Sequence, residues 1–160
     1  MATLERKENG WTLGDQLIKS AYNLSEIRAQ GIHEYPDNPE YADYFLTTDD
    51  WRLRVKLCRI RFAADNDNRW HLQTLTHSDC SYYIFSGKGE ALLDKDRWAP
   101  IKTGDLIYWN AGQPSGIRVT DPAEEVWYLS VEGPGPVAIA DVDGNLHSVV
   151  GNGPPPERTH

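Results

Sequence analysis

The chain has 160 residues, of which 24 are acidic and 16 basic, and its formal net charge is −8 at pH 7. This length suits one domain with a full hydrophobic core, and the negative charge argues against binding to nucleic acid or to an anionic membrane surface. Two cysteines without a pairing pattern, a start without an apolar signal core and the lack of an apolar run of about 20 residues predict a soluble, cytoplasmic protein.

The first fifty residues show little strand pattern. Apolar residues at spacings of three and four within residues 12–31 predict one or two short amphipathic helices that end at Gly31. Residues 31–50 mix proline, asparagine, aspartate and aromatic residues without a steady period, which is typical of a long covering loop. We therefore expect residues 1–50 to form helices and a loop that pack over the outside of the domain or across an opening.

Strand patterns dominate from residue 51 onward. In residues 51–62 the apolar positions change phase near Leu57, which predicts a β-bulge there. The charged residues of this strand predict a solvated face, and the alternative is that one of them enters the interior and holds a carboxylate; they are Arg52, Arg54, Lys56, Arg59 and Arg61. Further short strands are predicted at residues 69–76, 81–87, 90–94, 105–110, 115–120 and 125–131. Short antiparallel strands at this spacing are typical of a sandwich or barrel.

The end of the chain divides at its prolines and glycines. The Gly-Pro-Gly-Pro segment that begins at Gly133 ends the strand block, so residues 51–132 are the predicted barrel core. Residues 133–150 predict a hairpin around Asp143 and Gly144 that completes the same domain. Residues 151–160 predict a disordered tail.

Two segments of the strand block resemble the two motifs of the cupin superfamily. Residues 83–87 form an aromatic and aliphatic run that ends in Gly87, as in the first motif. Gly104 and Asp105 open the second segment, and a turn at residues 110–114 closes it, as in the second motif. The resemblance covers about residues 51–131. It implies an all-β fold, a cupin-type antiparallel β-barrel or jelly roll, to which short N-terminal helices are added, and it implies a homodimer formed through sheet contacts.

The resemblance also implies where a metal would bind, and the usual ligands are missing from these positions. Most catalytic cupins hold a metal through a His-x-His pair, a glutamate and one more histidine. The corresponding positions of this chain are Thr74 and Thr76, then Cys80, then Ser115. Hydroxyl groups are poor ligands for such divalent metals, so we expect no bound metal and no other cofactor.

The register of the strand that carries Thr74 leaves an alternative open. If Thr74 and Thr76 face the interior, His77 faces outward. A slip by one residue would turn the strand over, remove the threonines and bring histidines to the cavity side. The corresponding alternative function is a metal-dependent oxygenase whose ligands come from His71, His77, Asp79 and Cys80.

The expected interior would present hydroxyls, a thiol and aromatic faces, which suit a small organic ligand. Tyr82 is the candidate acid or oxyanion donor, and His77 at the barrel rim is the candidate base. The predicted substrate-binding residues are Thr74, Thr76, Cys80, Trp109, Ser115, Ile117 and, from the covering loop, His33. The alternative for Tyr82 and Trp109 is core filling, and for Cys80 it is an inert buried thiol.

These residues favour a metal-independent lyase, isomerase or cyclase that acts on a small organic molecule by acid–base catalysis. Metal-free members of the cupin superfamily carry out such reactions, so this prediction follows from the resemblance. The first alternative is a non-catalytic barrel that binds or senses a small molecule, which explains the missing metal ligands without a further assumption. The expected partners are a small-molecule ligand and a second copy of the chain.

Overall fold

The computed structural model describes residues 4–7, 10–13, 16–18, 32–36, 38–46, 54–63, 73–75, 77–94, 96–134, 137–140 and 146–150. The chain divides into two compact units, Met1–Ile32 and His33–His160. In the first unit, β1 (Leu4–Lys7), β2 (Gly10–Leu13) and β3 (Gln16–Ile18) pair in that order as an antiparallel sheet.

The predicted N-terminal helices are not confirmed. The part of residues 12–31 that the structure describes is extended, because Trp11, Thr12 and Leu13 pair across β2 and β3 with partners in Gln16–Ile18. Residues 19–31 lie outside the described residues, so the helical prediction stays untested there. Within the described ranges every regular element is a strand, which confirms the all-β class, and no helix is long and apolar enough to cross a membrane.

The second unit begins earlier than the predicted barrel core. Residues 31–50 were expected to form a loop, but β4 (His33–Tyr35) and β5 (Asn38–Phe45) form an antiparallel pair, and β5 continues into pairing with β6 (Arg54–Arg61). The loop prediction is therefore wrong for these residues. Prolines and aspartates in this segment interrupt the alternation of apolar and polar residues by which a strand is recognised. In the structure Tyr41 and Asp43 lie on one face of β5, paired with Ile60 and Cys58 of β6.

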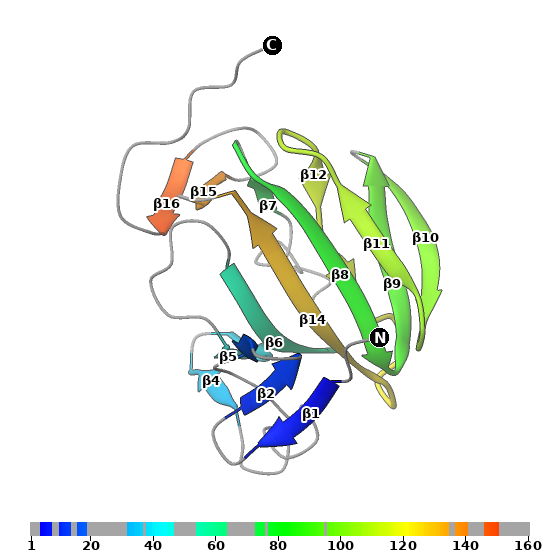
Figure 1. Cartoon of the computed structure of the whole chain (residues 1–160). Helices are drawn as coiled ribbons and strands as arrows, with labels where there is room; N and C mark the ends of the chain where they lie inside the picture. Colours follow the sequence, from blue (N-terminus) through cyan, green and yellow to red (C-terminus); the bar gives the residue numbers. More distant parts are fainter. Residues whose placement is uncertain are drawn as a thin grey trace. The chain divides into compact units, whose positions relative to one another are not determined.

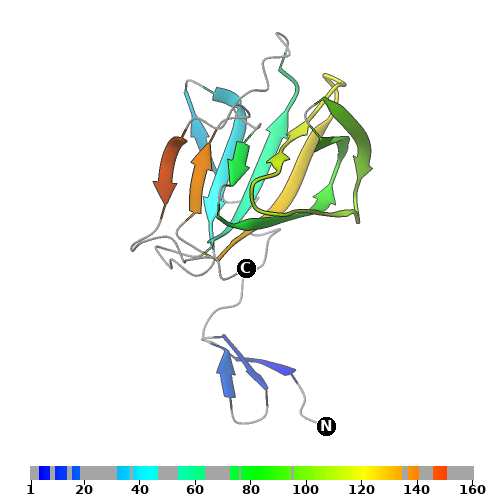
Figure 2. The ribbon, with the colours of Figure 1, turned by 90° about the horizontal axis from the view of Figure 1, so that it is seen from above.

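The described strands of the second unit form three antiparallel sheets (Figures 1 and 2). Their orders are β10-β9-β13, β11-β8-β14-β6-β5-β4 and β12-β7-β15-β16. The remaining strands are β7 (Gln73–Leu75), β8 (Asp79–Ser86), β9 (Lys88–Asp94), β10 (Arg97–Lys102), β11 (Leu106–Trp109), β12 (Pro114–Ser115), β13 (Ile117–Arg118), β14 (Glu125–Gly133), β15 (Val137–Ala140) and β16 (Leu146–Val150). The late strand β14 thus lies between the two early strands β6 and β8.

The core lies on one face of these strands because side chains alternate along each strand. On β8, Cys80, Tyr82 and Ile84 are buried, whereas Tyr83 between them is 43% exposed. Trp109 of β11 belongs to the same buried cluster. Of the residues predicted to face the interior, Cys80, Tyr82, Trp109 and Ile117 belong to the buried core cluster, and Ser115 is buried as well.

Strand β6 contains no bulge, contrary to the prediction. Its residues pair one to one with β14 and with β5, without a shift of register. The change of phase near Leu57 arises because both faces are covered: Leu57 and Cys58 are each 0% exposed. The predicted solvated face is also wrong for Arg54, Lys56 and Arg59, which are buried.

Gly87 fixes the turn between β8 and β9. Its φ of 92° is a left-handed conformation, and a Cβ at this position would lie 1.9 Å from the carbonyl oxygen of Glu125. Its own carbonyl accepts a hydrogen bond from the backbone N–H of Thr103 at 2.9 Å. Gly87, the glycine of the first sequence motif, therefore fixes the position at which β8 ends and the chain turns into β9.

Candidate functional site

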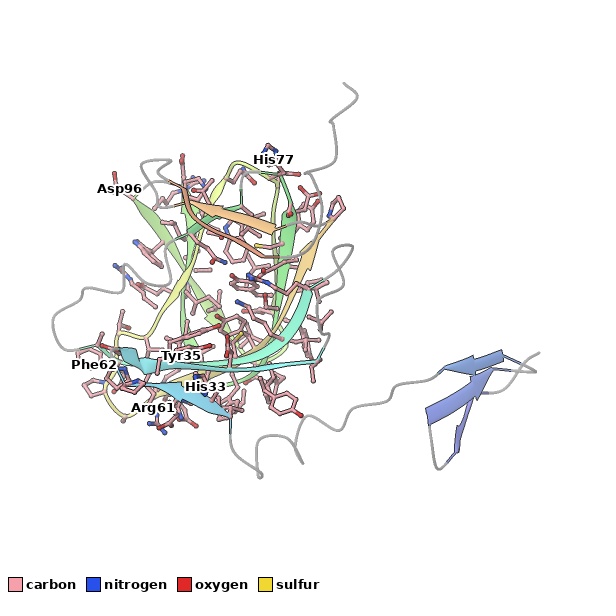
Figure 3. The ribbon with its side chains drawn as sticks, turned by 90° about the vertical axis from the view of Figure 1, so that its left-hand side faces the viewer. His33, Tyr35, Arg61, Phe62, His77 and Asp96 are labelled. Atoms are coloured by element: carbon pink, nitrogen blue, oxygen red, sulfur yellow. The ribbon has the colours of Figure 1, made fainter. Side chains whose placement is uncertain are left out.

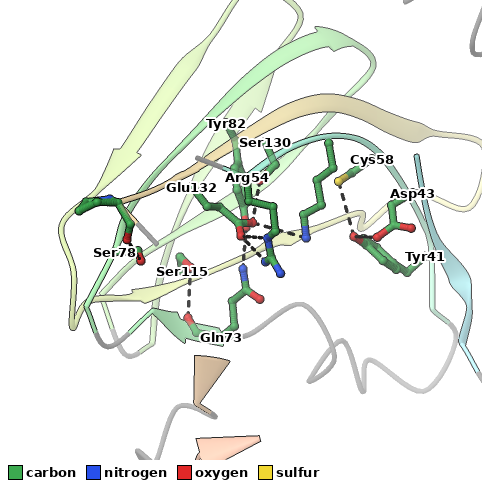
Figure 4. Close-up of polar contacts among 12 residues, drawn as sticks. Tyr41, Asp43, Arg54, Cys58, Gln73, Ser78, Tyr82, Ser115, Ser130 and Glu132 are labelled. Carbon is green, nitrogen blue, oxygen red and sulfur yellow. Dashed lines mark hydrogen bonds and ion pairs between the residues drawn. The ribbon is translucent and has the colours of Figure 1, made fainter. Parts of the chain in front are cut away.

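A cluster of ionised side chains lies inside the second unit, on strands β6 and β14. Glu132 is 0% exposed and pairs directly with Arg54 in the ladder. Arg54 Nε donates to Glu132 Oε2 at 2.5 Å, Lys56 Nζ lies 3.4 Å from Oε1, and Ser130 Oγ donates to Oε1 at 2.8 Å (Figure 4). Tyr128, on the same face of β14 as Ser130 and Glu132, belongs to the core cluster. The ion cluster therefore faces the interior.

The charge state of Glu132 follows from these neighbours. Burial alone would raise the pKa of Glu132, but the charges of Lys56 and Arg54 and hydrogen bonds from Ser130 and Arg54 outweigh burial and lower the pKa. The carboxylate is therefore ionised at neutral pH. A carboxylate with a lowered pKa is a weak base and a good anchor for cations.

A second pair of polar groups lies in the same interior. Gln73 Nε2 donates to Tyr82 Oη at 3.0 Å (Figure 4). The Tyr82 ring packs against Trp109 and Tyr128, with centroid distances of 5.0 and 4.6 Å. Burial, with the nearby Cys80 and Glu132 as further causes, raises the pKa of Tyr82 well above its ordinary value of 10.0. Tyr82 is therefore a neutral phenol that keeps its proton.

The register of β7 differs from the prediction by one residue. Gln73 reaches the buried Tyr82, and Leu75 belongs to the core cluster. Because side chains alternate, Thr74 between them lies on the other face of β7. The inward orientation predicted for Thr74 is wrong, and the slipped register raised as an alternative is the one observed at these residues. Thr76 and His71 lie outside the described residues.

Cys80 and Ser115 are buried beside the cluster, as predicted. Burial, with the negative charge of Glu132 as the next cause, raises the pKa of Cys80 to about 12, although a hydrogen bond with Ser115 acts in the other direction. Ser115 Oγ also donates to the backbone oxygen of Gln73 at 3.1 Å. A thiol with this pKa stays protonated, which favours the inert reading of Cys80 over a nucleophile.

Strand β5 contributes a carboxylate that the sequence did not single out. Asp43 is 4% exposed and accepts hydrogen bonds from Tyr35 Oη and Tyr41 Oη, both at 2.9 Å. Tyr41 Oη also lies 3.5 Å from Cys58 Sγ (Figure 4). Burial, strengthened by the bond to Asp43, raises the pKa of Tyr35 to about 12, so this phenol also stays protonated.

The structure does not bring the two predicted histidines together. Figure 3 shows His77 near one end of the second unit and His33 near the other. His33 is exposed and packs edge-on against Tyr35, with a centroid distance of 4.5 Å. His77 is half-buried at a bend before β8, and no described contact joins it to Tyr82. Roles for His77 as a base and for His33 in binding stay predictions.

The described residues do not fit a metal ion. Among them, no three histidine, cysteine, aspartate or glutamate side chains converge on one point. Asp79, from the alternative ligand set, accepts hydrogen bonds from Tyr108 Oη and the Ala111 N–H, each at 2.8 Å. Glu132 is already bound by two cations, which would repel a divalent metal. The expected absence of a metal also depends on residues outside the described ranges, so it stays a prediction.

The fold is similar to solved structures of cupin and double-stranded β-helix proteins. An uncharacterized conserved protein with a double-stranded beta-helix domain from Klebsiella pneumoniae matches with a TM-score of 0.59 and 18% identity, over 76% of this chain and 95% of that one. The Cnp3 cupin domain of Schizosaccharomyces pombe matches with a TM-score of 0.54 and 12% identity, over 83% and 85%. DMSP lyase DddQ from Ruegeria pomeroyi matches with a TM-score of 0.53 and 18% identity, over 72% and 58%.

At these identities the likeness concerns the fold and not the activity. The chain spans 58% of the lyase chain and 54% of an HTH_3 family transcriptional regulator from Vibrio cholerae, which is also similar. The sequence itself matches no protein-family model and no curated protein. The two sequence motifs predicted the fold of the cupin superfamily. The order of the strands in the sheets and these structural neighbours show that the chain has this fold.

Proposed function

We propose that the chain binds a small organic molecule inside its barrel, at the interior cluster formed by Arg54, Lys56, Glu132, Gln73 and Tyr82. The observation that carries this proposal is the buried ionic group itself. Replacing a buried ion pair by apolar residues of similar volume is often neutral or stabilising. Stability therefore gives no reason to keep three ionised groups inside a small barrel, whereas ligand recognition by a few convergent polar groups does.

A second candidate function is metal-independent acid–base catalysis by a lyase, isomerase or cyclase. One observation favours it: the neutral phenol of Tyr82 and the ionised carboxylate of Glu132 lie in the same interior, so one group can donate a proton and the other can accept one. The lowered pKa of Glu132 and the raised pKa of Tyr82 make both groups poor proton carriers near pH 7. Binding is therefore the better-supported function.

One experiment separates the two functions. The full chain is incubated with a defined mixture of small metabolites, unbound compounds are removed by ultrafiltration, and retained compounds are identified by mass spectrometry after short and long incubation. A compound that is retained and emerges unchanged supports binding, and a compound that is converted supports catalysis. Retention of no compound overturns the proposed function.

Two variants give this experiment its control. Gln73→Leu combined with Tyr82→Phe removes the neutral polar pair from the interior, so we expect weaker retention. Leu93→Ser changes a side chain that is 43% exposed on β9, so retention should stay as in the wild type. His77→Ala tests the histidine: loss of conversion with retention unchanged would support its predicted role as the base.

We also propose that the chain forms a homodimer in the cytoplasm. On the face of the six-stranded sheet that points away from the interior, Tyr83 pairs with Leu106 on one side and with Leu129 on the other. This row carries no charge, so two copies of a chain with net charge −8 can meet there without bringing like charges into contact. Light scattering tests this proposal, and Leu106→Glu should shift the mass toward the monomer.

A further inference from the structure

We infer that the ligand of the interior cluster carries a carboxylate, which binds Arg54 and Lys56 on the side away from Glu132. This inference rests on the proposed function, because it names the chemical class of the molecule bound there. Three observations carry it: the balance of charge, the hydrogen-bond geometry of Arg54, and the part of the cluster that solvent reaches.

The charges of the cluster do not balance among the described residues. Arg54 and Lys56 both contact one carboxylate, that of Glu132. The other buried carboxylate nearby belongs to Asp43, whose two oxygens accept hydrogen bonds from two phenols, and no described ion pair joins it to either cation. A buried charge without a partner is costly. A ligand carboxylate would supply the second negative charge.

The guanidinium of Arg54 is only partly satisfied by Glu132. Nε donates to Glu132 Oε2, and Nη2 forms an ion pair with the same oxygen. An arginine that binds a carboxylate through two parallel bonds uses both oxygens. Here Oε1 is taken by Lys56 and Ser130 instead. Both nitrogens thus share one oxygen, and no described contact uses Nη1 of Arg54, which is the donor that a second carboxylate can use.

Solvent reaches part of the side chains of Arg54 and Lys56 but not the side chain of Glu132. The side chains of Arg54 and Lys56 are 8% and 10% exposed, whereas that of Glu132 is 0% exposed. A molecule that approaches the cluster therefore meets positive charge first. An anion gains from this arrangement and a cation is repelled, since like charges in a poorly solvated site interact strongly.

Aromatic side chains lie in the same interior as the cluster. The rings of Tyr82, Trp109 and Tyr128 pack together in the interior, and Lys56 Nζ lies 5.8 Å from the centre of the Tyr41 ring. Aromatic faces favour unsaturated groups, and cations favour carboxylates. Benzoate is the simplest probe that has both features.

The test is a calorimetric titration of the full chain with benzoate, with benzamide as a neutral control of the same shape. We expect benzoate to bind at least roughly tenfold more tightly than benzamide, which corresponds to about 1.4 kcal/mol. Equal affinities, or no saturable binding of benzoate below about 10 mM, overturn the inference. Inorganic phosphate that displaces benzoate at equal concentration also overturns it, because the site would then select any anion.

Substitution of Glu132 provides a result that a purely structural role would not give. Glu132→Gln keeps the shape but removes the competing carboxylate, so benzoate gains both cations and should bind roughly tenfold more tightly. Unchanged or weaker binding by a folded Glu132→Gln chain overturns the inference. Glu90→Gln, which removes a carboxylate paired with Arg118 on other strands, is the control and should leave affinity unchanged.

A charge-balanced variant covers the case in which the single substitution unfolds the chain. Arg54→Gln combined with Glu132→Gln removes one charge of each sign, and it should weaken benzoate binding at least roughly tenfold. Wild-type affinity in this variant overturns the inference. If the metabolite experiment retains a neutral compound while benzoate does not bind, the carboxylate inference fails and the proposed function stands. If nothing binds in either experiment, both fail.

Discussion

Arg54 and Glu132 lie directly opposite each other on neighbouring strands, although they are 78 residues apart in the sequence, and their side chains form a buried ion pair. Lys56, two residues along the same strand, reaches the other oxygen of the carboxylate. The pair thus depends on the alignment of β6 with β14. Any slip of that alignment by one residue would turn these groups out of the interior.

Removal of the carboxylate should destabilise the protein strongly. Glu132→Ala leaves two buried cations without their partner, so we expect the free energy of unfolding to fall by about 3–5 kcal/mol. Urea unfolding followed by tryptophan fluorescence measures this change. Replacement of all three groups, as Arg54→Met, Lys56→Met and Glu132→Leu, should leave stability within about 1 kcal/mol of the wild type or raise it. A loss below about 1 kcal/mol in Glu132→Ala would contradict the described ion pairing.

The lowered pKa of Glu132 predicts a loss of stability in acid. Its pKa in the folded state lies below the ordinary value of 4.5, so the carboxylate stabilises the fold fully above about pH 4.5. This contribution is lost as the pH falls from 4.5 through the folded-state pKa. Unfolding experiments between pH 6 and pH 3 should therefore give a shallower acid slope for Glu132→Gln than for the wild type. Asp96→Asn, an exposed position, should keep the wild-type slope, and equal slopes in all three chains would refute the prediction.

Both thiols should resist modification in the native protein. Burial raises the pKa of Cys58 to about 11 and that of Cys80 to about 12, and both side chains are buried. Thiolate is the reactive form, so at pH 8 we expect a disulfide reagent to modify neither cysteine before unfolding and both in concentrated urea. Spectrophotometric titration counts the reacting thiols. Rapid native reaction of Cys80 would restore the nucleophile interpretation.

Two glycines with similar backbone angles should respond very differently to alanine. Gly87 and Gly104 have φ values of 92° and 96°, but a Cβ on Gly87 would meet a backbone oxygen, whereas nothing lies within 4 Å of a Cβ on Gly104. Gly104→Ala should cost about 1–2 kcal/mol through backbone strain alone. Gly87→Ala should cost at least about 4 kcal/mol or prevent folding. Thermal unfolding compares them, and equal losses would mean that the close approach at Gly87 is absent.

The sequence predicted best those strands that can be recognised from their own residues, without knowledge of what packs against them. Strands β8 and β9 are short runs rich in apolar and aromatic residues on either side of Gly87, and these runs predicted the two strands and the turn. Strand β6 misled the prediction because both of its faces are covered. The burial of its second face depends on contacts with distant parts of the chain. A search for alternating apolar and polar residues in 54–61 therefore cannot reveal it.

The site was predicted less well than the fold. The side-chain direction in β7 was wrong because a strand of three residues, with polar Gln73 on the inner face, gives too little pattern to fix its register. Arg54 was considered only as an alternative, and Glu132 was missed, since their pairing joins distant parts of the chain. One signal was present in β14: Ser130 and Glu132 lie two residues apart on the face that also carries Tyr128.

The place of β14 in the middle of its sheet has a consequence for synthesis of the chain. During translation β6 and β8 are complete before β14 exists, yet they pair with β14 and not with each other. Until Glu125–Gly133 is made, one edge of β6 and one edge of β8 lack the strand with which they form hydrogen bonds. Arg54 and Lys56 also lack the carboxylate of Glu132. Such long-range pairing slows folding and prolongs exposure of strand edges. Chaperone demand should therefore be greatest in the interval between the completion of β8 and the emergence of β14 from the ribosome.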